Sequence, residues 1–130
     1  MNFASHWSSR LLSVLRIMAG LLFLEHGTSK LLGFPPPQMA HPFVLMSMYG
    51  FSGILEFVGG ILIVIGLFTR FTAFILSGEM AVAYFTVHVY GGFFPMLNKG
   101  ELAVLYCFVF LYMAVAGGGA WSLDRLRGRH

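Results

Sequence analysis

The chain has 130 residues, of which 58% are hydrophobic and only 10% are charged, and its mean hydropathy is +0.80. Soluble domains carry about 25% charged residues, so this composition excludes a soluble enzyme, a nucleic-acid-binding module and a disordered tail. The length leaves no room for a second domain. The net charge of +3 does not indicate nucleic acid as a partner, because Arg125, Arg127 and Arg129 lie together in a basic C-terminal tail, 119–130, typical of a juxtamembrane segment.

Four apolar stretches predict membrane-spanning helices, at about 11–32, 43–69, 71–90 and 102–118. A bilayer core about 30 Å thick requires about 20 mostly apolar residues in a helix. The first stretch has no small-residue cleavage pattern after it, so we interpret it as a retained span and not a signal peptide. Glycines and prolines separate the first span from the second and the third from the fourth. The sequence therefore predicts a single all-α membrane domain, a four-transmembrane-helix up-down bundle.

The cations predict the orientation of this bundle. With the N-terminus inside, six arginines fall on the inner side and two lysines on the outer side, and such a bias marks the cytoplasmic face. The inner set is Arg10, Arg16, Arg70, Arg125, Arg127 and Arg129, and the outer set is Lys30 and Lys99. Both termini are expected in the cytoplasm.

Cys107 is the only cysteine. It can form no disulfide within the chain, and there is no CxxC pair for dithiol exchange or zinc binding. A self-contained thiol oxidoreductase is therefore excluded, and Cys107 is expected to act as a small apolar packing residue.

Ionisable side chains inside the predicted spans are the candidate functional residues, because a charge in hydrocarbon is costly and tends to face the bundle interior. They are Glu25, His26, Glu56 and Glu79. At 1.5 Å per residue from the inner ends, Glu25 lies about 21 Å deep, Glu56 about 20 Å and Glu79 about 12 to 14 Å. Three carboxyls from three helices can therefore approach one another near the middle of the bilayer.

Two further groups extend this set toward the outer face. Lys30 lies one turn beyond His26 on the same helix face. His88 lies about 26 Å from the inner end, but about 180° around a straight helix from Glu79, so only one of those two can face the centre.

Structural roles are an open alternative for these residues. Glu and His side chains in membranes also hydrogen-bond across helices as neutral or paired groups, and Glu56 lies near Gly59 and Gly60, where backbones can pack closely. Five phenylalanines could line a slot for a flat ring, although packing and lipid contact are their more frequent roles. They are Phe23, Phe57, Phe85, Phe108 and Phe110.

Five blocks of the chain resemble the DoxX family in order and sequence. They are GLLFLEHGTSKLLGF at 20–34, GILEFVGG at 53–60, GLFTR at 66–70, EMAVAYFTVH at 79–88 and GAWSLD at 119–124. The resemblance implies a small bacterial inner-membrane protein of four helices. It also implies quinone-linked redox chemistry, because the family takes its name from quinol oxidase and thiosulfate:quinone oxidoreductase systems. The matching motif positions are Glu25, His26, Gly27, Lys30, Glu56, Gly59, Gly60, Arg70 and His88.

The leading functional hypothesis is a quinone-linked oxidoreductase, or a subunit of one, in redox or stress homeostasis. His26 would donate a hydrogen bond to a quinone carbonyl, and Glu25, Glu56 and Glu79 would exchange protons. Lys30 and His88 would connect this quinone site to the outer face. A redox partner protein would exchange the electrons, because the chain has no nucleotide-binding fingerprint or recognisable flavin site.

Two other classes of function stay open. In the first, His26 and His88 ligate a haem, or Glu25, Glu56 and Glu79 with His26 hold a divalent metal ion. In the second, the protein is a membrane scaffold or a small proton or cation transporter, which four short spans could form only as a homo-oligomer.

Overall fold

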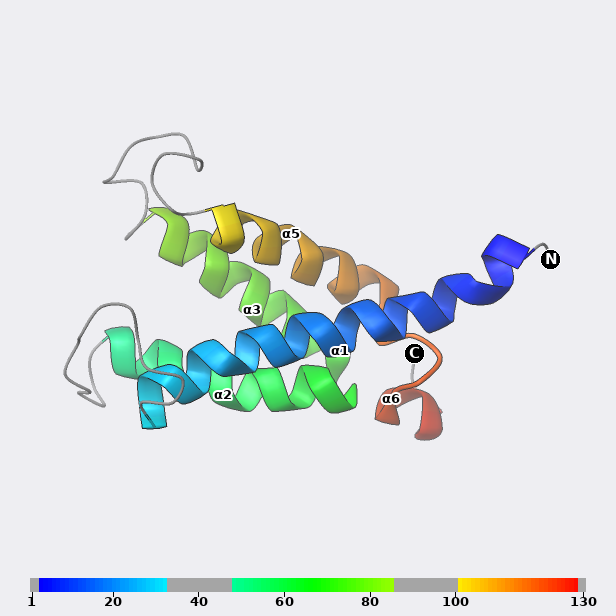
Figure 1. Cartoon of the computed structure of the whole chain (residues 1–130), viewed down its shortest axis with the longest axis horizontal. Helices are drawn as coiled ribbons and strands as arrows, with labels where there is room; N and C mark the ends of the chain where they lie inside the picture. The colour runs from blue at the N-terminus through cyan, green and yellow to red at the C-terminus, as the bar shows by residue number, and fades with distance from the viewer. Residues whose placement is uncertain (1–2, 33–47, 86–100, 129–130) are drawn as a thin grey trace.

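The computed structural model describes residues 3–32, 48–85 and 101–128, and within these ranges the chain is helical, with no strand. The helices are α1 (Phe3–Leu32), α2 (Met48–Ile65), α3 (Thr69–Ala83), α5 (Glu101–Ala116) and α6 (Leu123–Leu126). Figure 1 shows the four longer helices running along the same general direction, with both marked chain ends at one end of the bundle. The α2–α3 turn at 66–68 and the loop 117–122 also lie there, and we call it the turn end.

The helix boundaries differ from the predicted spans. Helix α1 begins at Phe3 and not near residue 11, so its first turns extend beyond the bundle (Figure 1). Helix α2 ends at Ile65, and the turn that follows needs left-handed backbone, with φ of 73° at Gly66 and 52° at Phe68. Glycine adopts this conformation without strain. Among the described residues, α1 is the one helix long and apolar enough to cross a membrane, while Gly50–Ile65 and Glu101–Ala116 are shorter apolar helices.

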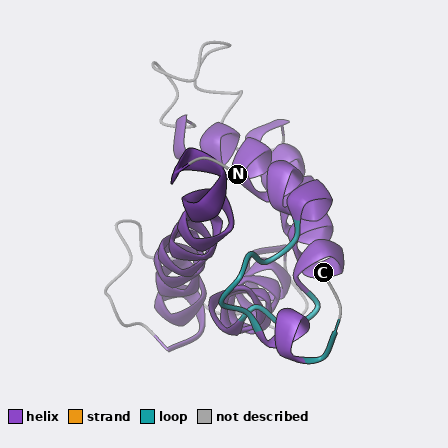
Figure 2. Cartoon of the chain, turned by 90° about the vertical axis from the view of Figure 1, so that its right-hand side faces the viewer, coloured by secondary structure: helices purple, strands orange, loops and turns teal. Residues whose placement is uncertain are grey.

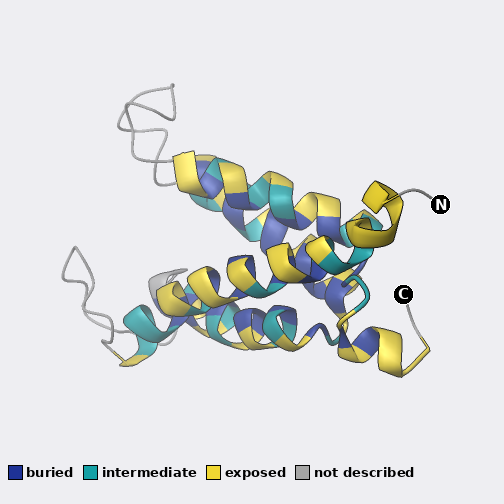
Figure 3. Ribbon diagram, turned by 45° about the vertical axis from the view of Figure 1, so that its right-hand side comes forward, coloured by how far each residue is buried: buried dark blue, intermediate teal, exposed yellow. Residues whose placement is uncertain are grey.

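The helices associate as two pairs, α1 with α2 and α3 with α5, and the α2–α3 turn joins them. Figure 2 views this arrangement from the turn end. Large apolar side chains cover the outside of both pairs, whereas buried residues face between the helices (Figure 3). The exposed set includes Leu21, Leu22, Phe71, Phe74, Leu105 and Val115. Exposed apolar surfaces of this extent mark contact with a membrane or with another protein.

Glycines seven residues apart allow the close α1–α2 contact. Gly20 and Gly27 on α1 face α2, and Gly53 and Gly60 on α2 face α1. A Cβ atom added at Gly27 would lie 2.5 Å from the Phe57 backbone nitrogen, and one at Gly20 would lie 3.0 Å from the Val64 nitrogen. Small residues of this kind let membrane helices pack backbone to backbone. The glycine pattern therefore sets both the spacing and the rotation of the pair.

A buried arginine and aspartate fasten the turn end. Arg16 is 1% exposed and donates to the carbonyl oxygens of Ile63 (2.9 Å), Trp121 (2.7 Å) and Gly118. These carbonyls belong to the last turn of α2 and to the loop after α5, where helix C-termini leave acceptors unsatisfied. From the sequence, Arg16 is expected among the charges on the inner side of the bundle, and nothing in the sequence predicts that its side chain is buried.

Asp124 binds the other side of the same turn. Its carboxylate accepts hydrogen bonds of 2.8 Å from the backbone N–H groups of Phe68 and Thr69, at the start of α3. A carboxylate at a helix N-terminus satisfies unpaired donors and interacts favourably with the helix dipole. Residues 119–124 of the predicted basic tail are therefore part of the folded bundle, and Asp124 is buried.

Candidate functional site

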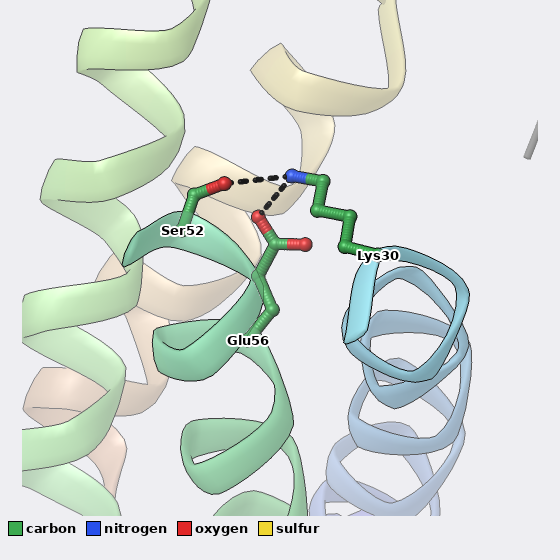
Figure 4. A network of polar contacts seen from close by, with 3 residues as sticks. All are labelled: Lys30, Ser52 and Glu56. Carbon is green, nitrogen blue, oxygen red and sulfur yellow. Dashed lines mark hydrogen bonds and ion pairs between the residues drawn. The ribbon is translucent and has the colours of Figure 1, made fainter. Parts of the chain in front are cut away.

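A polar cluster lies between α1 and α2, away from the buried Arg16 and Asp124 of the turn end. The Lys30 ammonium donates to Ser52 Oγ and to Glu56 Oε2, both at 2.9 Å (Figure 4). Glu56 is 2% exposed, and the Lys30 side chain is 24% exposed. A buried carboxylate is stable only with such pairing and hydrogen bonding, so Lys30 compensates the burial of Glu56.

The cluster follows from the glycine contacts of the α1–α2 pair. A Cβ at Gly53 would lie 3.0 Å from Lys30 Cβ, so the lysine stem crosses α2 at a position with no side chain. Ser52 and Glu56 are one turn apart on α2 and therefore present their side chains on the same face. At Gly27 the backbone of α1 approaches the backbone of Glu56 closely. This approach brings Ser52 and Glu56 of α2 within reach of the Lys30 ammonium of α1.

Glu79 of α3 adds a second carboxyl, which interacts with the Glu56 carboxyl and the Lys30 ammonium. Gly59 lies against the Leu76 side chain where α2 and α3 approach, since a Cβ there would be 2.9 Å from Leu76 Cδ2. Within the described part of the chain, Glu56 Oε1 and Glu79 Oε1 are buried and have no hydrogen-bond partner. Two carboxyls facing one ammonium can hold a shared proton, and their remaining oxygens can accept further hydrogen bonds.

An aromatic cluster lies beside these polar groups, between α1 and α5. The Phe23 ring is edge-on to Tyr106 at 5.3 Å and to Phe110 at 5.1 Å between centroids, and Tyr106 and Phe110 stack at 5.7 Å. The His26 ring meets Tyr106 edge-on at 6.2 Å. Tyr106 interacts electrostatically with Glu25 and Glu56. The ring contact with Tyr106 places the exposed His26 at the edge of the aromatic cluster.

The structure assembles some of the predicted site residues and separates others. Lys30, Glu56 and Glu79 meet, whereas Glu25 and His26 are exposed. The convergence of three carboxyls therefore stays a prediction for Glu25, whose side chain is exposed. Gly27 faces α2, and Glu25, which lies two residues before Gly27, is about 160° around the α1 axis from that contact.

The remaining predicted residues divide in the same way. Phe23 and Phe110 are buried in the aromatic cluster, Phe57 is half-buried, and Phe85 and Phe108 are exposed. His88 lies outside the described residues. No group of three or more His, Cys, Asp or Glu side chains in the described ranges is arranged to hold a metal ion.

Ser52 and Tyr106 are members of the two clusters that sequence reasoning missed. Ser52 carried a usable signal, because it lies one turn before Glu56 on the same helix face. Tyr106 carried none, because aromatic residues are frequent in all four spans and only the contact between α1 and α5 selects it.

Comparison with known proteins gives one consistent family. The family model described as DoxX matches residues 11–89. An uncharacterized protein of Haemophilus influenzae is 44% identical over 95% of this chain and 96% of its own length. The Escherichia coli inner membrane protein YqjF is 31% identical over 87% of this chain and 88% of its own. The Bacillus subtilis protein named "Putative oxidoreductase CatD" is 26% identical over 85% and 82%, respectively. No solved structure matches the chain.

Proposed function

Because the chain belongs to the DoxX family, we propose that it is an inner-membrane protein in which α1, α2, α3 and α5 cross the bilayer as an up-down bundle. The apolar exterior and the common end of both termini support this topology (Figures 1 and 3). Arg10, Arg70, Arg125 and Arg127 all belong to the turn end, which supports a cytoplasmic location for that end. The predicted parts 43–47 and 86–90 of two spans lie outside the described residues.

Within this topology the protein acts as a quinone-linked oxidoreductase or as a subunit of one. The observation that carries the proposal is the Lys30–Glu56–Glu79 cluster, in which Glu56 is buried, Lys30 and Glu79 are half-buried, and each carboxyl keeps one buried oxygen without a hydrogen-bond partner within the described part of the chain. Ionisable groups in hydrocarbon are costly, and they commonly mark proton or substrate pathways. The oxidoreductase name of one relative agrees with this assignment.

Each cluster has a role in the proposed reaction. Reduction of one quinone to quinol takes up two electrons and two protons. The exposed His26 is placed to donate a hydrogen bond to a quinone carbonyl oxygen, and the buried Phe23 and Tyr106 rings form the apolar packing beside it. Glu56 and Glu79 exchange the protons, Lys30 holds Glu56 in position, and a redox partner protein exchanges the electrons.

The test compares Glu56→Gln with Glu101→Gln in native membranes. Glu101 is an exposed carboxyl in the first turn of α5, so its variant controls for the loss of one charge. Purified wild-type protein should carry quinone detectable by solvent extraction and mass detection, and its membranes should reduce added quinone. Glu56→Gln and His26→Ala should lose most of this reduction, and Glu101→Gln should retain it. Equal reduction in all variants would contradict the proposal.

Proton or small-cation transport by a homo-oligomer is the second candidate. It is favoured by the facing Glu56 and Glu79 carboxyls, because such a pair can bind a proton or a cation between its oxygens. Proteoliposomes loaded with a pH-sensitive dye separate the two functions. Transport predicts proton flux without quinone or a redox partner, and the oxidoreductase predicts none.

A further inference from the structure

A hollow at the turn end is distinct from the polar and aromatic clusters. It has a volume of about 270 Å³ and lies between the first turns of α1, the last turns of α5 and the loop that leads to α6. Five of its lining residues carry hydroxyl or guanidinium groups, and no lining residue is acidic. These five are Ser8, Ser9, Tyr112, Ser122 and Arg125. We call this space the turn-end hollow.

The wall of the turn-end hollow is held by specific contacts. Ser13 Oγ donates to the Ser9 carbonyl at 3.2 Å and accepts from Trp121 N at 2.9 Å, and Ala120 N donates to the Ser9 carbonyl at 3.2 Å. Gly119 has φ of 87°, and a Cβ there would lie 2.6 Å from the same carbonyl oxygen. The loop is therefore pressed against α1. A hollow with a fixed wall loses little conformational entropy when a ligand binds.

The electrostatic balance around the hollow favours an anion. Arg125 lines it, and Arg10, Arg70 and Arg127 belong to the same end of the bundle. The acidic residue described at this end is Asp124, and its carboxylate is already hydrogen-bonded to the N–H groups of Phe68 and Thr69. Hydroxyls and a guanidinium are the donors that proteins use for phosphate groups.

The surroundings of the hollow favour a lipid as the source of that phosphate. Tyr112 lines the hollow and also belongs to the exposed apolar side of α5, together with Leu111 and Val115. The exposed Trp7 and Trp121 are ring systems that settle at membrane–water interfaces. A phosphate in the hollow would therefore lie at headgroup depth, with acyl chains free to follow the α5 surface.

We propose that the turn-end hollow binds the phosphate of an anionic phospholipid, with Arg125 and the hydroxyls of Ser8 and Ser9 as its donors. The leaflet is the cytoplasmic one, a point that rests on the proposed topology and not on the quinone chemistry. Arg125 lines the hollow, whereas the other arginines of the turn end are not among its lining residues. Binding at this site should therefore depend on Arg125 in particular and not on the total positive charge of the turn end.

The experiment measures lipid retention by native mass spectrometry after reconstitution in nanodiscs of phosphatidylglycerol or phosphatidylcholine. Wild-type protein should retain one phosphatidylglycerol, and Arg125→Gln should weaken retention about tenfold, as for the loss of one charge-assisted contact. Arg127→Gln is the matched control, because that guanidinium lies 5.0 Å over the Phe68 ring, and it should bind like wild type. Ser8→Ala removes a hydroxyl and should weaken retention severalfold.

Three results would overturn the proposal. Equal loss in Arg125→Gln and Arg127→Gln would indicate diffuse electrostatic attraction. Equal retention of phosphatidylcholine would exclude recognition of an anionic lipid. Stabilisation of detergent-purified protein by millimolar inorganic phosphate, without lipid retention, would assign the hollow to a soluble phosphate compound. Thermal unfolding in phosphatidylcholine nanodiscs confirms that the variants are folded, and if Arg125→Gln is not folded, Ser8→Ala decides.

Discussion

Replacing Gly27 by alanine tests the glycine contacts that assemble the polar cluster. The added Cβ would lie 2.5 Å from the Phe57 nitrogen and 2.7 Å from the Phe57 Cα, whereas ordinary contact begins at 3.4 Å. Both neighbours are backbone atoms of α2, so no side-chain rotation can relieve the overlap, and α1 and α2 must move apart. Overpacking of this kind costs about 1 to 3 kcal/mol. Separation would also lengthen the 2.9 Å contact between Lys30 and Glu56.

Gly78 provides the matched control on α3. A Cβ added there meets nothing within 4 Å, so Gly78→Ala gains only helix propensity, worth up to about 1 kcal/mol. The assay is unfolding of both variants in mild detergent, followed by circular dichroism. We expect Gly27→Ala to be less stable than wild type and Gly78→Ala to be equal or more stable. If Gly27→Ala is as stable as Gly78→Ala, the reasoning about close α1–α2 packing is refuted.

Two further predictions concern the buried charges. Lys30→Met should lower the free energy of unfolding by about 3 to 5 kcal/mol, because it leaves Glu56 buried without its cation. In the same unfolding assay, the double variant Lys30→Met/Glu56→Gln should recover much of that loss. Simple additivity of the two single changes would show that the pair is not coupled. Asp124→Ala should lower the free energy of unfolding by about 1 to 2 kcal/mol, because it removes the carboxylate that accepts from the N–H groups at the start of α3. The same variant should speed trypsin cleavage after Arg125. The control Glu101→Ala, which changes an exposed carboxyl, should have neither effect. Unchanged cleavage of Asp124→Ala would contradict the role of Asp124 in fastening the turn end.

The helical class and the candidate residues were accessible from the sequence, because both depend on local properties. Runs of apolar residues predict buried or lipid-facing helices, and an ionisable residue within such a run is conspicuous. Glu56, Glu79 and Lys30 were identified in this way, and the structure brings them together. The helix ends were less accessible. Helix α1 contacts the loop 117–122 through Ser9 and Ser13, and that loop is remote from α1 in sequence.

Arg16 shows why the turn end could not be predicted. An arginine near the start of an apolar span usually lies at the inner face of the membrane. The position of Arg16 in the sequence does not distinguish this exposed role from a buried one. Its partners are the carbonyls of Ile63, Gly118 and Trp121, and backbone carbonyls carry no signal in a sequence. Only the folded bundle places them around one guanidinium.

The sequence by itself determined that the chain is an all-helical protein of the DoxX family with ionisable groups inside apolar helices. The tertiary structure decided which of those groups meet. Lys30 lies about 60° around α1 from Gly27, and Glu25 about 160°. The contact of Gly27 with the Phe57 backbone therefore turns Lys30 toward Glu56 and leaves Glu25 exposed. The rotation of a helix about its axis depends on its partner helices, and this dependence is the physical reason that the site required the structure.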